Sequence, residues 1–208
     1  MELLPSAISE LYAVLQETSC GAVSPRIGDR SGASQETPRR TLWGWPLRPF
    51  RSDGRLLTRV DRLPGSCMLI STEALVCVGL FDERYFLYWE EIDLCCRLRR
   101  ANQKLLIAGN VAAVHQGAEK PRLKRHRTYY TWRNQIYFSF KNYGPFLGAL
   151  FVARRVLIAD MREVWQYLQS GKKELVLAGL AGLWAGLRGE QGPSVSRFAL
   201  PETPVPGL

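Results

Sequence analysis

Three carboxylates that are suited to acid–base chemistry lie close together, at Glu90, Glu91 and Asp93. The sequence around them predicts a helix over about 90–101. On that helix Glu91 falls on the same face as the apolar residues three, four and seven positions further along. Glu90 and Asp93 fall on another face, where Asp93 can pair with Arg97 one turn later. Of the three, Glu91 is therefore expected to point with the apolar side chains toward the interior.

An inward carboxylate must be hydrogen-bonded, paired or functional, because burial of an unpaired charge costs too much free energy. A general base that takes a proton from a hydroxyl group needs such a place, partly withdrawn from water. A structural alternative stays open, since acids at a helix N-terminus complement the helix dipole. That alternative accounts for Glu90 and Asp93 but leaves the direction of Glu91 unexplained. We take Glu91 as the candidate base and keep Glu90 and Asp93 as catalytic candidates.

The elements that would position this helix mix helices with strands, which predicts an α/β core over the first 118 residues. Ser71 or Thr72 can cap one helix at its start, and Gly79 can end it. A polar stretch rich in Gly, Pro and Arg is interpreted as a long loop. The expected elements are a helix over 7–17, a strand over 21–27, the loop over 28–55, a buried strand over 65–70, a helix over 73–78, an aromatic strand or loop over 81–88, the carboxylate helix, and strands over 104–108 and 111–115.

From residue 120 onward the sequence is basic and helical. Helices are predicted over 124–142, 145–169 and 173–188, followed by a Pro-rich tail that we expect to be disordered. The whole net charge of +9 falls after residue 119, and no acid lies between Lys120 and Ile158. Such a patch attracts phosphates on nucleic acid, on anionic lipid or on a phosphorylated substrate, and basicity alone does not choose among them.

The N-terminus and the cysteines bear on location. Glu2 and Glu10 interrupt what would be the apolar part of a signal peptide, and no basic leader precedes it. No stretch reaches the roughly 18 apolar residues that span a bilayer. The 5 cysteines are odd in number and lie mostly in apolar runs, so we expect neither a disulfide framework nor a zinc site. A reducing, cytoplasmic location is expected.

Five short motifs follow one another between Gly65 and Asn134. They are Gly65-Ser66-Cys67-Met68, Gly79-Leu80-Phe81-Asp82-Glu83-Arg84-Tyr85-Phe86, Glu90-Glu91-Ile92-Asp93-Leu94, His115 after a short apolar strand, and Tyr129-Tyr130-Thr131-Trp132-Arg133-Asn134. In this order they resemble the C-terminal half of family 2 glycosyltransferases of the GT-A fold, in particular the rhamnosyltransferase-like branch that builds bacterial cell-surface polysaccharides. No single motif is specific, but the series of five is.

The resemblance implies transfer of a sugar from a nucleotide-sugar donor with inversion at the anomeric carbon. Glu91 would be the general base, at a position where the family usually has Asp. A divalent cation, Mg²⁺ or Mn²⁺, would hold the charge of the departing nucleoside diphosphate, and His115 matches a residue that helps bind it in some relatives. The positions expected to touch substrates are Gly65, Ser66, Cys67, Trp89, Arg133 and Asn134. A structural role stays open for His115, and for Arg133 and Asn134 as part of a helix that packs its aromatic residues.

The donor side of such an enzyme is not recognisable in this sequence. The family has an N-terminal nucleotide-binding unit with an Asp-x-Asp metal motif, and no Asp-x-Asp occurs here. We expect a partial GT-A, Rossmann-like mixed sheet over 1–118, a basic helical extension over 119–190 and a disordered tail over 191–208. We expect the chain to be truncated, with the N-terminal half encoded upstream or supplied in trans. That half would provide most of the ligands of the cation, and the chain alone is expected to be inactive.

Three functional hypotheses result. The first is a transferase that acts on a lipid-linked or polysaccharide acceptor at the inner membrane face, in peripheral contact with anionic lipid through the basic helices. The apolar faces of those helices can instead pack against a partner or into the domain itself. The second is a non-catalytic binding module that uses the basic patch for nucleic acid. Against it, the patch has no nucleic-acid motif and its aromatic residues have the spacing of a helix core, so nucleic acid is not expected as a partner. The third is an inactive remnant whose sheet has lost its first strands.

Overall fold

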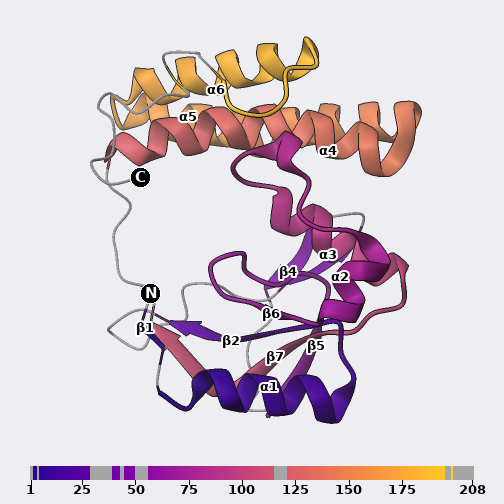
Figure 1. The fold of residues 1–208 in the computed structure, drawn as a ribbon. Coiled ribbons are helices and arrows are strands. Elements are labelled where there is room, and N and C mark those ends of the chain that lie inside the picture. The colour runs from indigo at the N-terminus through magenta and orange to yellow at the C-terminus, as the bar shows by residue number, and fades with distance from the viewer. Residues whose placement is uncertain are drawn as a thin grey trace. The chain divides into compact units, whose positions relative to one another are not determined.

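The computed structural model describes residues 2–3, 5–28, 39–42, 45–49, 56–114, 121–194 and 198. The chain divides into two compact units, which we describe separately (Figure 1). Unit 1 comprises Met1–Phe81 and Glu91–Ala118, and unit 2 comprises Asp82–Glu90 and Glu119–Leu208. The described part is mixed α/β, which confirms the predicted fold class.

The central sheet of unit 1 is mixed, with strand order β1-β7-β2-β6 and with β5 also paired to β7. Strands β7 and β2 are parallel, whereas β1 and β5 pair with β7, and β6 with β2, in the antiparallel sense. The strands of this sheet are β1 (Glu2–Leu3), β2 (Ala22–Gly28), β5 (Leu57–Val60), β6 (Leu69–Ile70) and β7 (Leu105–Val114).

Strand β7 is one strand where the sequence predicted two. Its pairing with β2 is irregular, because Pro25 pairs with Ala108 whereas the next residue, Arg26, pairs with Ala112. The residues passed over, 109–111, include the gap at 109–110 that separated the two predicted strands. Pro25 has no N–H to give to the ladder, which suits a break in pairing at this point.

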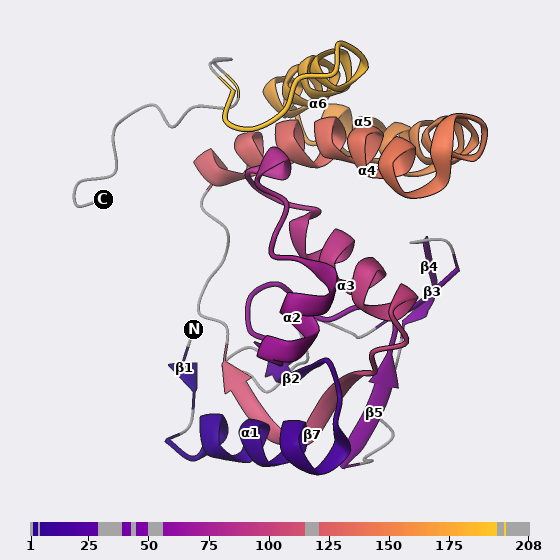
Figure 2. The ribbon, with the colours of Figure 1, turned by 45° about the vertical axis from the view of Figure 1, so that its right-hand side comes forward.

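Helices cover both faces of this sheet (Figure 2). Helix α1 (Ala7–Thr18) packs on one face, where Leu106 and Ala108 of β7 join its core. Helices α2 (Thr72–Val78) and α3 (Glu90–Arg100) lie on the other face, where Leu105 and Ile107 join theirs. Alternate residues of a strand point to opposite faces, so one apolar run supplies both layers.

The local signals around α2 were correct. The Ser71 hydroxyl accepts a hydrogen bond of 3.2 Å from the Ala74 amide at the start of the helix. At the end, Gly79 adopts a φ of 83° and donates its amide to the Leu75 carbonyl. A residue with a side chain is strained at this φ, so glycine allows the helix to stop here.

Two predictions for the first unit were wrong in extent. The buried strand expected over 65–70 is reduced to β6, which is only half-buried, and residues 65–67 form a turn. The stretch expected to be a loop over 28–55 contains a two-stranded hairpin, β3 (Arg39–Leu42) with β4 (Trp45–Pro49). Residues 29–38, 43–44 and 50–55 of that stretch lie outside the described residues.

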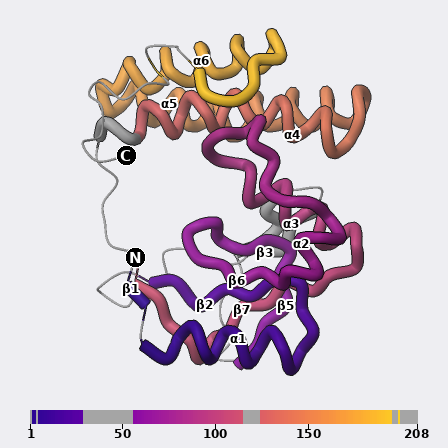
Figure 3. The backbone as a smooth tube through the Cα atoms, in the orientation of Figure 1, coloured from indigo at the N-terminus to yellow at the C-terminus, as the bar shows by residue number. Residues whose placement is uncertain are grey.

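Unit 2 consists of helices joined to the segment Asp82–Glu90. The long α4 (Pro121–Arg155) is interrupted at Gly144, whose φ of 72° and ψ of −177° are not helical, and Pro145 follows. The chain then continues through a π turn, η2 (Val156–Asp160), into α5 (Met161–Gln169) and then α6 (Lys173–Leu187). Figure 3 traces this path. The three predicted helices are confirmed, with the break where Gly-Pro placed it.

Helix α6 packs very closely on the first part of α4. A Cβ atom on Gly182 would lie 2.2 Å from the Tyr129 carbonyl oxygen, so only a residue without a side chain fits there. Among the residues described, no helix combines the length and the apolar character that crossing a membrane requires.

Candidate functional site

Glu91 lies in the first turn of α3 and is turned inward, as predicted, with 9% of its surface exposed. Arg62 Nη2 donates a 2.8 Å hydrogen bond to Glu91 Oε1, which makes the two side chains an ion pair. Gly65 packs on the same side chain, since a Cβ atom built there would be 3.0 Å from Glu91 Cγ. The buried charge is therefore paired, as burial demands.

Residues 61–65, which we call the strap, run antiparallel along one stripe of α3. At one end the Asp61 carboxylate lies 3.4 Å from Arg99 Nε. In the middle the Leu63 amide donates to Cys95 Sγ at 3.4 Å. At the other end Gly65 packs on Glu91, and the Arg62 side chain reaches the same carboxylate. The three helix positions are four residues apart, so the strap follows neighbouring turns of one face.

The sequence had not identified the strap as part of the site. Burial raises the pKa of Cys95 to about 12, so its thiol stays protonated and serves as a packing and hydrogen-bonding group. Arg62 stands three residues before the Gly65 motif, but no periodicity links it to an acid 29 residues further along. The pairing of Arg62 with Glu91 depends on the packing of the strap along α3.

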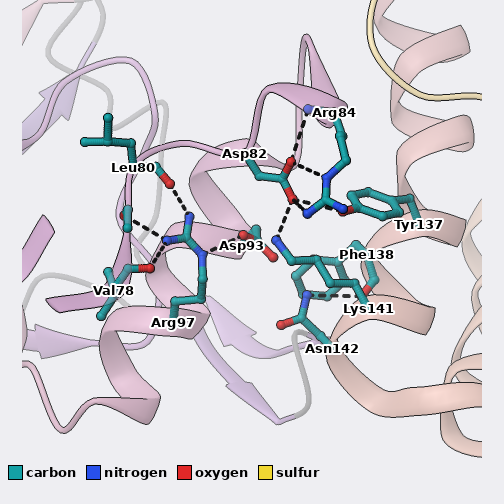
Figure 4. Close-up of polar contacts among 11 residues, drawn as sticks. Val78, Leu80, Asp82, Arg84, Asp93, Arg97, Tyr137, Phe138, Lys141 and Asn142 are labelled. Atoms are coloured by element: carbon teal, nitrogen blue, oxygen red, sulfur yellow. Dashed lines mark hydrogen bonds and ion pairs between the residues drawn. The ribbon is translucent and has the colours of Figure 1, made fainter. Parts of the chain in front are cut away.

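The expectation that Glu91 alone of the three acids points toward the interior is wrong, because the Asp93 side chain is fully buried. Its predicted pairing with Arg97 is confirmed, with Arg97 Nε donating to Asp93 Oδ2 at 2.8 Å. Arg97 also donates to the carbonyl oxygens of Val78, Gly79 and Leu80 at 2.7–2.9 Å (Figure 4). The chain leaving α2 covers this face of α3, which the helix pattern alone does not show.

The Asp93–Arg97 pair therefore closes the C-terminal end of α2, whose last carbonyls need donors. This placement favours a structural role for Asp93 over the catalytic one that we had kept. Glu90, the remaining acid of the run, is half-buried and belongs to unit 2.

In unit 2 the segment that leads into α3 is strained. Phe86, Tyr88 and Trp89 adopt positive φ values of 64°, 64° and 77°. Bulky residues avoid this region, and each such residue costs on the order of 1–3 kcal/mol. We call residues 85–89 the aromatic turn. Such a conformation persists only where its surroundings hold it in place.

Asn134 and Arg133 of α4 hold the aromatic turn. Asn134 Nδ2 donates to the carbonyl oxygens of Tyr85, Leu87 and Tyr88 at 2.7–2.9 Å. Arg133 Nη2 donates to the Tyr85 carbonyl at 2.9 Å, and both α4 side chains are buried. Their donors are directed at backbone carbonyls. This favours the structural alternative over the substrate contacts that the resemblance implied for them.

Further contacts of Arg133 fix the start of the C-terminal tail. Its Nη1 donates to the Gly192 carbonyl at 2.6 Å, and its guanidinium lies 4.6 Å from the centre of the Tyr130 ring. The Tyr130 hydroxyl accepts the Ser194 amide at 3.1 Å. Residues 191–194 are thus bound to α4, whereas 195–197 and 199–208 lie outside the described residues.

Trp89 is also an interior residue. Its Nε1 donates to the Thr131 carbonyl at 3.0 Å, and its ring lies 4.9 Å from that of Phe138. The expectation that it touches substrate finds no support in this packing. Gly65 and Ser66 are exposed, and Cys67 is half-buried. Of the predicted substrate positions, these three lie on the same unit as Glu91, and Gly65 contacts it.

Asp82, from the second motif, connects the aromatic turn to α4 (Figure 4). It accepts hydrogen bonds from Arg84, from the Tyr137 hydroxyl at 3.0 Å and from Lys141 Nζ at 2.7 Å. Burial acts to raise the pKa of Asp82, but the hydrogen bonds from Arg84 and Lys141 outweigh it and hold that pKa well below its usual range. Together with the bonds from Arg133 and Asn134 to the Tyr85 carbonyl, these contacts join the second motif to α4 within one unit.

The expected metal site is not formed by the part of the chain that the structure describes. No group of three or more His, Cys, Asp or Glu side chains gathers there in a way that would hold an ion. His115, the predicted ligand, lies outside the described residues.

The chain is similar to curated glycosyltransferases. A hexosyltransferase of low-salt glycan biosynthesis from Haloferax volcanii is 30% identical over 207 aligned residues, which cover 92% of this chain and 65% of the relative. An N-acetylglucosaminyl-diphospho-decaprenol L-rhamnosyltransferase from Mycobacterium tuberculosis is 32% identical over 133 residues, 55% of this chain and 43% of the relative.

A rhamnosyltransferase from Escherichia coli is 43% identical over 58 residues, which cover 28% of this chain and 22% of the relative. No family model matches the chain. The chain spans less than two thirds of the length of each of these relatives. The resemblance identified from the five motifs is confirmed, because these relatives are hexosyl- and rhamnosyltransferases.

Proposed function

We propose, on the premise that this chain is a homologue of hexosyl- and rhamnosyltransferases, that it supplies the acceptor side of an inverting glycosyltransferase. The proposed reaction moves a sugar from a nucleotide-sugar donor to a hydroxyl group of a lipid-linked or polysaccharide acceptor at the cytoplasmic face of a membrane. The observation that carries the proposal is the placement of Glu91, a buried and oriented carboxylate bordered by the exposed Gly65.

In the proposed step Glu91 takes the proton of the acceptor hydroxyl while the oxygen of that hydroxyl forms a bond to the anomeric carbon of the donor sugar. The bond from that carbon to the diphosphate oxygen breaks, and the nucleoside diphosphate leaves with the electron pair. Attack from the side opposite the leaving group inverts the configuration. Glutamate reaches one methylene further than the aspartate that is usual at this position. A positioned base of this kind contributes typically 10²–10⁴-fold to a rate.

Arg62 supports this role by fixing the direction of the carboxylate before an acceptor arrives. Its guanidinium holds Oε1 of Glu91, and the strap holds Arg62 against α3. Preorganisation matters because a base that is not already oriented toward the acceptor hydroxyl contributes less to the rate. Arg62 is a positioning residue in this proposal.

The divalent cation remains part of the proposal. Mg²⁺ or Mn²⁺ would neutralise the departing diphosphate, with His115 as a proposed ligand. Since the described residues form no cluster that fits an ion, we assign no step of the reaction to it. The donor-binding residues are proposed to come from a nucleotide-binding half outside these 208 residues.

The test is a transfer assay with a panel of labelled nucleotide sugars, Mg²⁺ and a polyprenyl-diphosphate-linked sugar as acceptor. The chain is assayed alone and together with the nucleotide-binding half of the Haloferax volcanii relative as a separate polypeptide. We expect transfer in the mixture, none by the chain alone, and a loss of about 10²–10⁴-fold with Glu91→Gln. Glu17→Gln, an exposed carboxylate on α1, is the matched control.

Binding of the acceptor to the chain, followed by fluorescence, makes the assay informative even where the two halves do not complement each other. The proposal predicts that the chain binds the acceptor and that Glu91→Gln still binds it. A chain that neither binds the acceptor nor supports transfer, or a Glu91→Gln variant with an undiminished rate, would overturn the assignment.

A further inference from the structure

The helical run that follows Gly144 carries a long apolar surface. From Pro145 to Gln169 the last part of α4, the π turn and α5 continue one another. Large apolar side chains stay exposed along this run, with Phe146 at 89%, Leu157 at 71% and Trp165 at 63% of their surface. The full set, which we call the outer stripe, is Phe146, Leu147, Leu150, Leu157, Ile158, Met161, Trp165 and Leu168.

The spacing of the outer stripe is that of one helix face. Its members recur at intervals of three, four and seven residues, apart from two adjacent pairs, so they fall on one side of the run. At 1.5 Å per residue the run is about 35 Å long. Soluble proteins rarely leave a continuous apolar surface of this kind uncovered.

The exposed charges within the run are basic. They are Arg154 and Arg162, and the exposed Lys172, Lys173 and Glu174 follow the run, with Glu174 paired to Arg125 at 3.6 Å. Both acids of the run are at least half-buried. Asp160 is fully buried and accepts from Gln135 Nε2 at 2.6 Å, and Glu163 accepts from Trp132 Nε1 at 3.1 Å. The surface therefore pairs an apolar stripe with a mainly positive border.

We infer that the outer stripe docks this chain onto the surface of an anionic membrane, with the run lying in the plane of the interface. Apolar side chains would enter the headgroup region, Trp165 would lie at the boundary, and the basic side chains would meet lipid phosphates. The contact is peripheral, in keeping with described helices that are too short or too polar to span a bilayer.

Charge argues against a second copy of this chain as the occupant. A two-fold contact brings the same surface of two copies together, so Arg154 and Arg162 of one copy would face basic side chains of the other. Like charges that face each other across an interface disfavour the contact. Anionic lipid instead complements every exposed charge of the run. The inference rests on the surface of unit 2 and holds whether or not Glu91 is catalytic.

The first experiment is co-sedimentation of the whole chain with vesicles of phosphatidylcholine, with and without phosphatidylglycerol, at low and high salt. We expect binding to the anionic vesicles that falls as salt rises, because screening weakens the charge contribution. The triple variant Leu157→Ser, Trp165→Ser, Leu168→Ser should weaken binding at least tenfold. Val76→Ser, at an 82% exposed position on α2, is the matched control and should bind as the wild type does.

A second variant separates the charge from the apolar contribution. Arg162→Glu, Lys172→Glu, Lys173→Glu should lose the preference for anionic vesicles and the salt dependence. Sedimentation velocity without lipid then tests for a second copy. The inference is overturned if wild-type chain stays in the supernatant with anionic vesicles at low salt, or if the serine variant binds them as tightly as wild type. A dimer that the serine variant dissociates, with vesicle binding unchanged, assigns the stripe to a second copy instead.

Discussion

Gly65 and Glu91 are in close packing contact. A Cβ atom on Gly65 would lie 3.0 Å from Cγ and 3.1 Å from Cβ of Glu91, tighter than nine in ten real contacts of this kind, so the Glu91 side chain would have to shift by a few tenths of an ångström. The first and third motifs of the sequence are therefore linked by direct packing. A small residue at position 65 allows the carboxylate of α3 to lie where it does.

Gly65→Ala is expected to displace the Glu91 side chain. Overpacking of this kind costs about 1–3 kcal/mol of unfolding free energy, and a small shift of a reacting group lowers a rate by up to about 10²-fold. Urea unfolding measures the first effect and the transfer assay the second. In a Glu91→Ala background the Cγ contact is gone, so the stability cost of Gly65→Ala should shrink. An equal cost in both backgrounds would show that the two residues are not coupled.

Arg97→Ala is expected to lower the unfolding free energy of unit 1 strongly. It removes the charged partner of the fully buried Asp93 and four hydrogen bonds, a loss of about 3–5 kcal/mol. Arg99→Ala on the same helix is the control, because its pair with Asp61 is half-exposed and should be worth no more than about 1 kcal/mol. Chemical denaturation checks both. Similar losses for the two variants would contradict the role given to Arg97.

Asn134→Asp separates a structural role from a substrate-binding role. The change replaces a donor amide by a carboxylate facing three carbonyl oxygens, so the aromatic turn should lose its fixation. Arg133 Nε, which donates to Asn134 Oδ1 at 2.9 Å, remains as a donor, but the three carbonyl oxygens lose theirs, so we expect a loss of about 1–3 kcal/mol. Asn142→Asp, at a less buried site that donates to the Phe138 carbonyl at 3.1 Å, is the milder control. Unchanged stability together with weakened acceptor binding would restore the substrate role.

The sequence predicted the elements better than it predicted the surroundings of the site. Periodicity and capping identified α1, α2, α3 and the break at Gly144, because these signals are local. They also gave the inward direction of Glu91. The burial of Asp93 escaped prediction, since it depends on where the chain after α2 crosses α3. The partners of Arg133 and Asn134 are carbonyls of a distant turn, and no residue type in the sequence identifies a carbonyl partner.

Asp160 predicts a dependence of stability on pH. Burial raises the pKa of Asp160 to about 6, against about 3.9 for an aspartate in an unfolded chain. The folded state thus holds the proton more tightly than the unfolded state between those values. Stability should fall as pH rises through that window and stay level above it.

Asp160→Asn removes this contribution. The variant is expected to match wild type below about pH 4 and to be more stable than wild type at neutral pH. Urea midpoints taken between pH 4 and pH 8 measure the difference. The depressed pKa of Asp82 gives a slope of opposite sign at lower pH, but it is common to both proteins and cancels. Parallel curves for the two proteins across the window would contradict the prediction.

The strap also sets where this protein tolerates changes of length. A slip of one residue along α3 would bring Pro64, which has no N–H, opposite the Cys95 sulfur in place of the Leu63 amide. The register from Asp61 to Gly65 is therefore locked. Insertions that end before Asp61 leave the contacts between the strap and α3 unchanged. That junction is the natural point for exchanging the segment before Asp61 between related chains without moving the carboxylate.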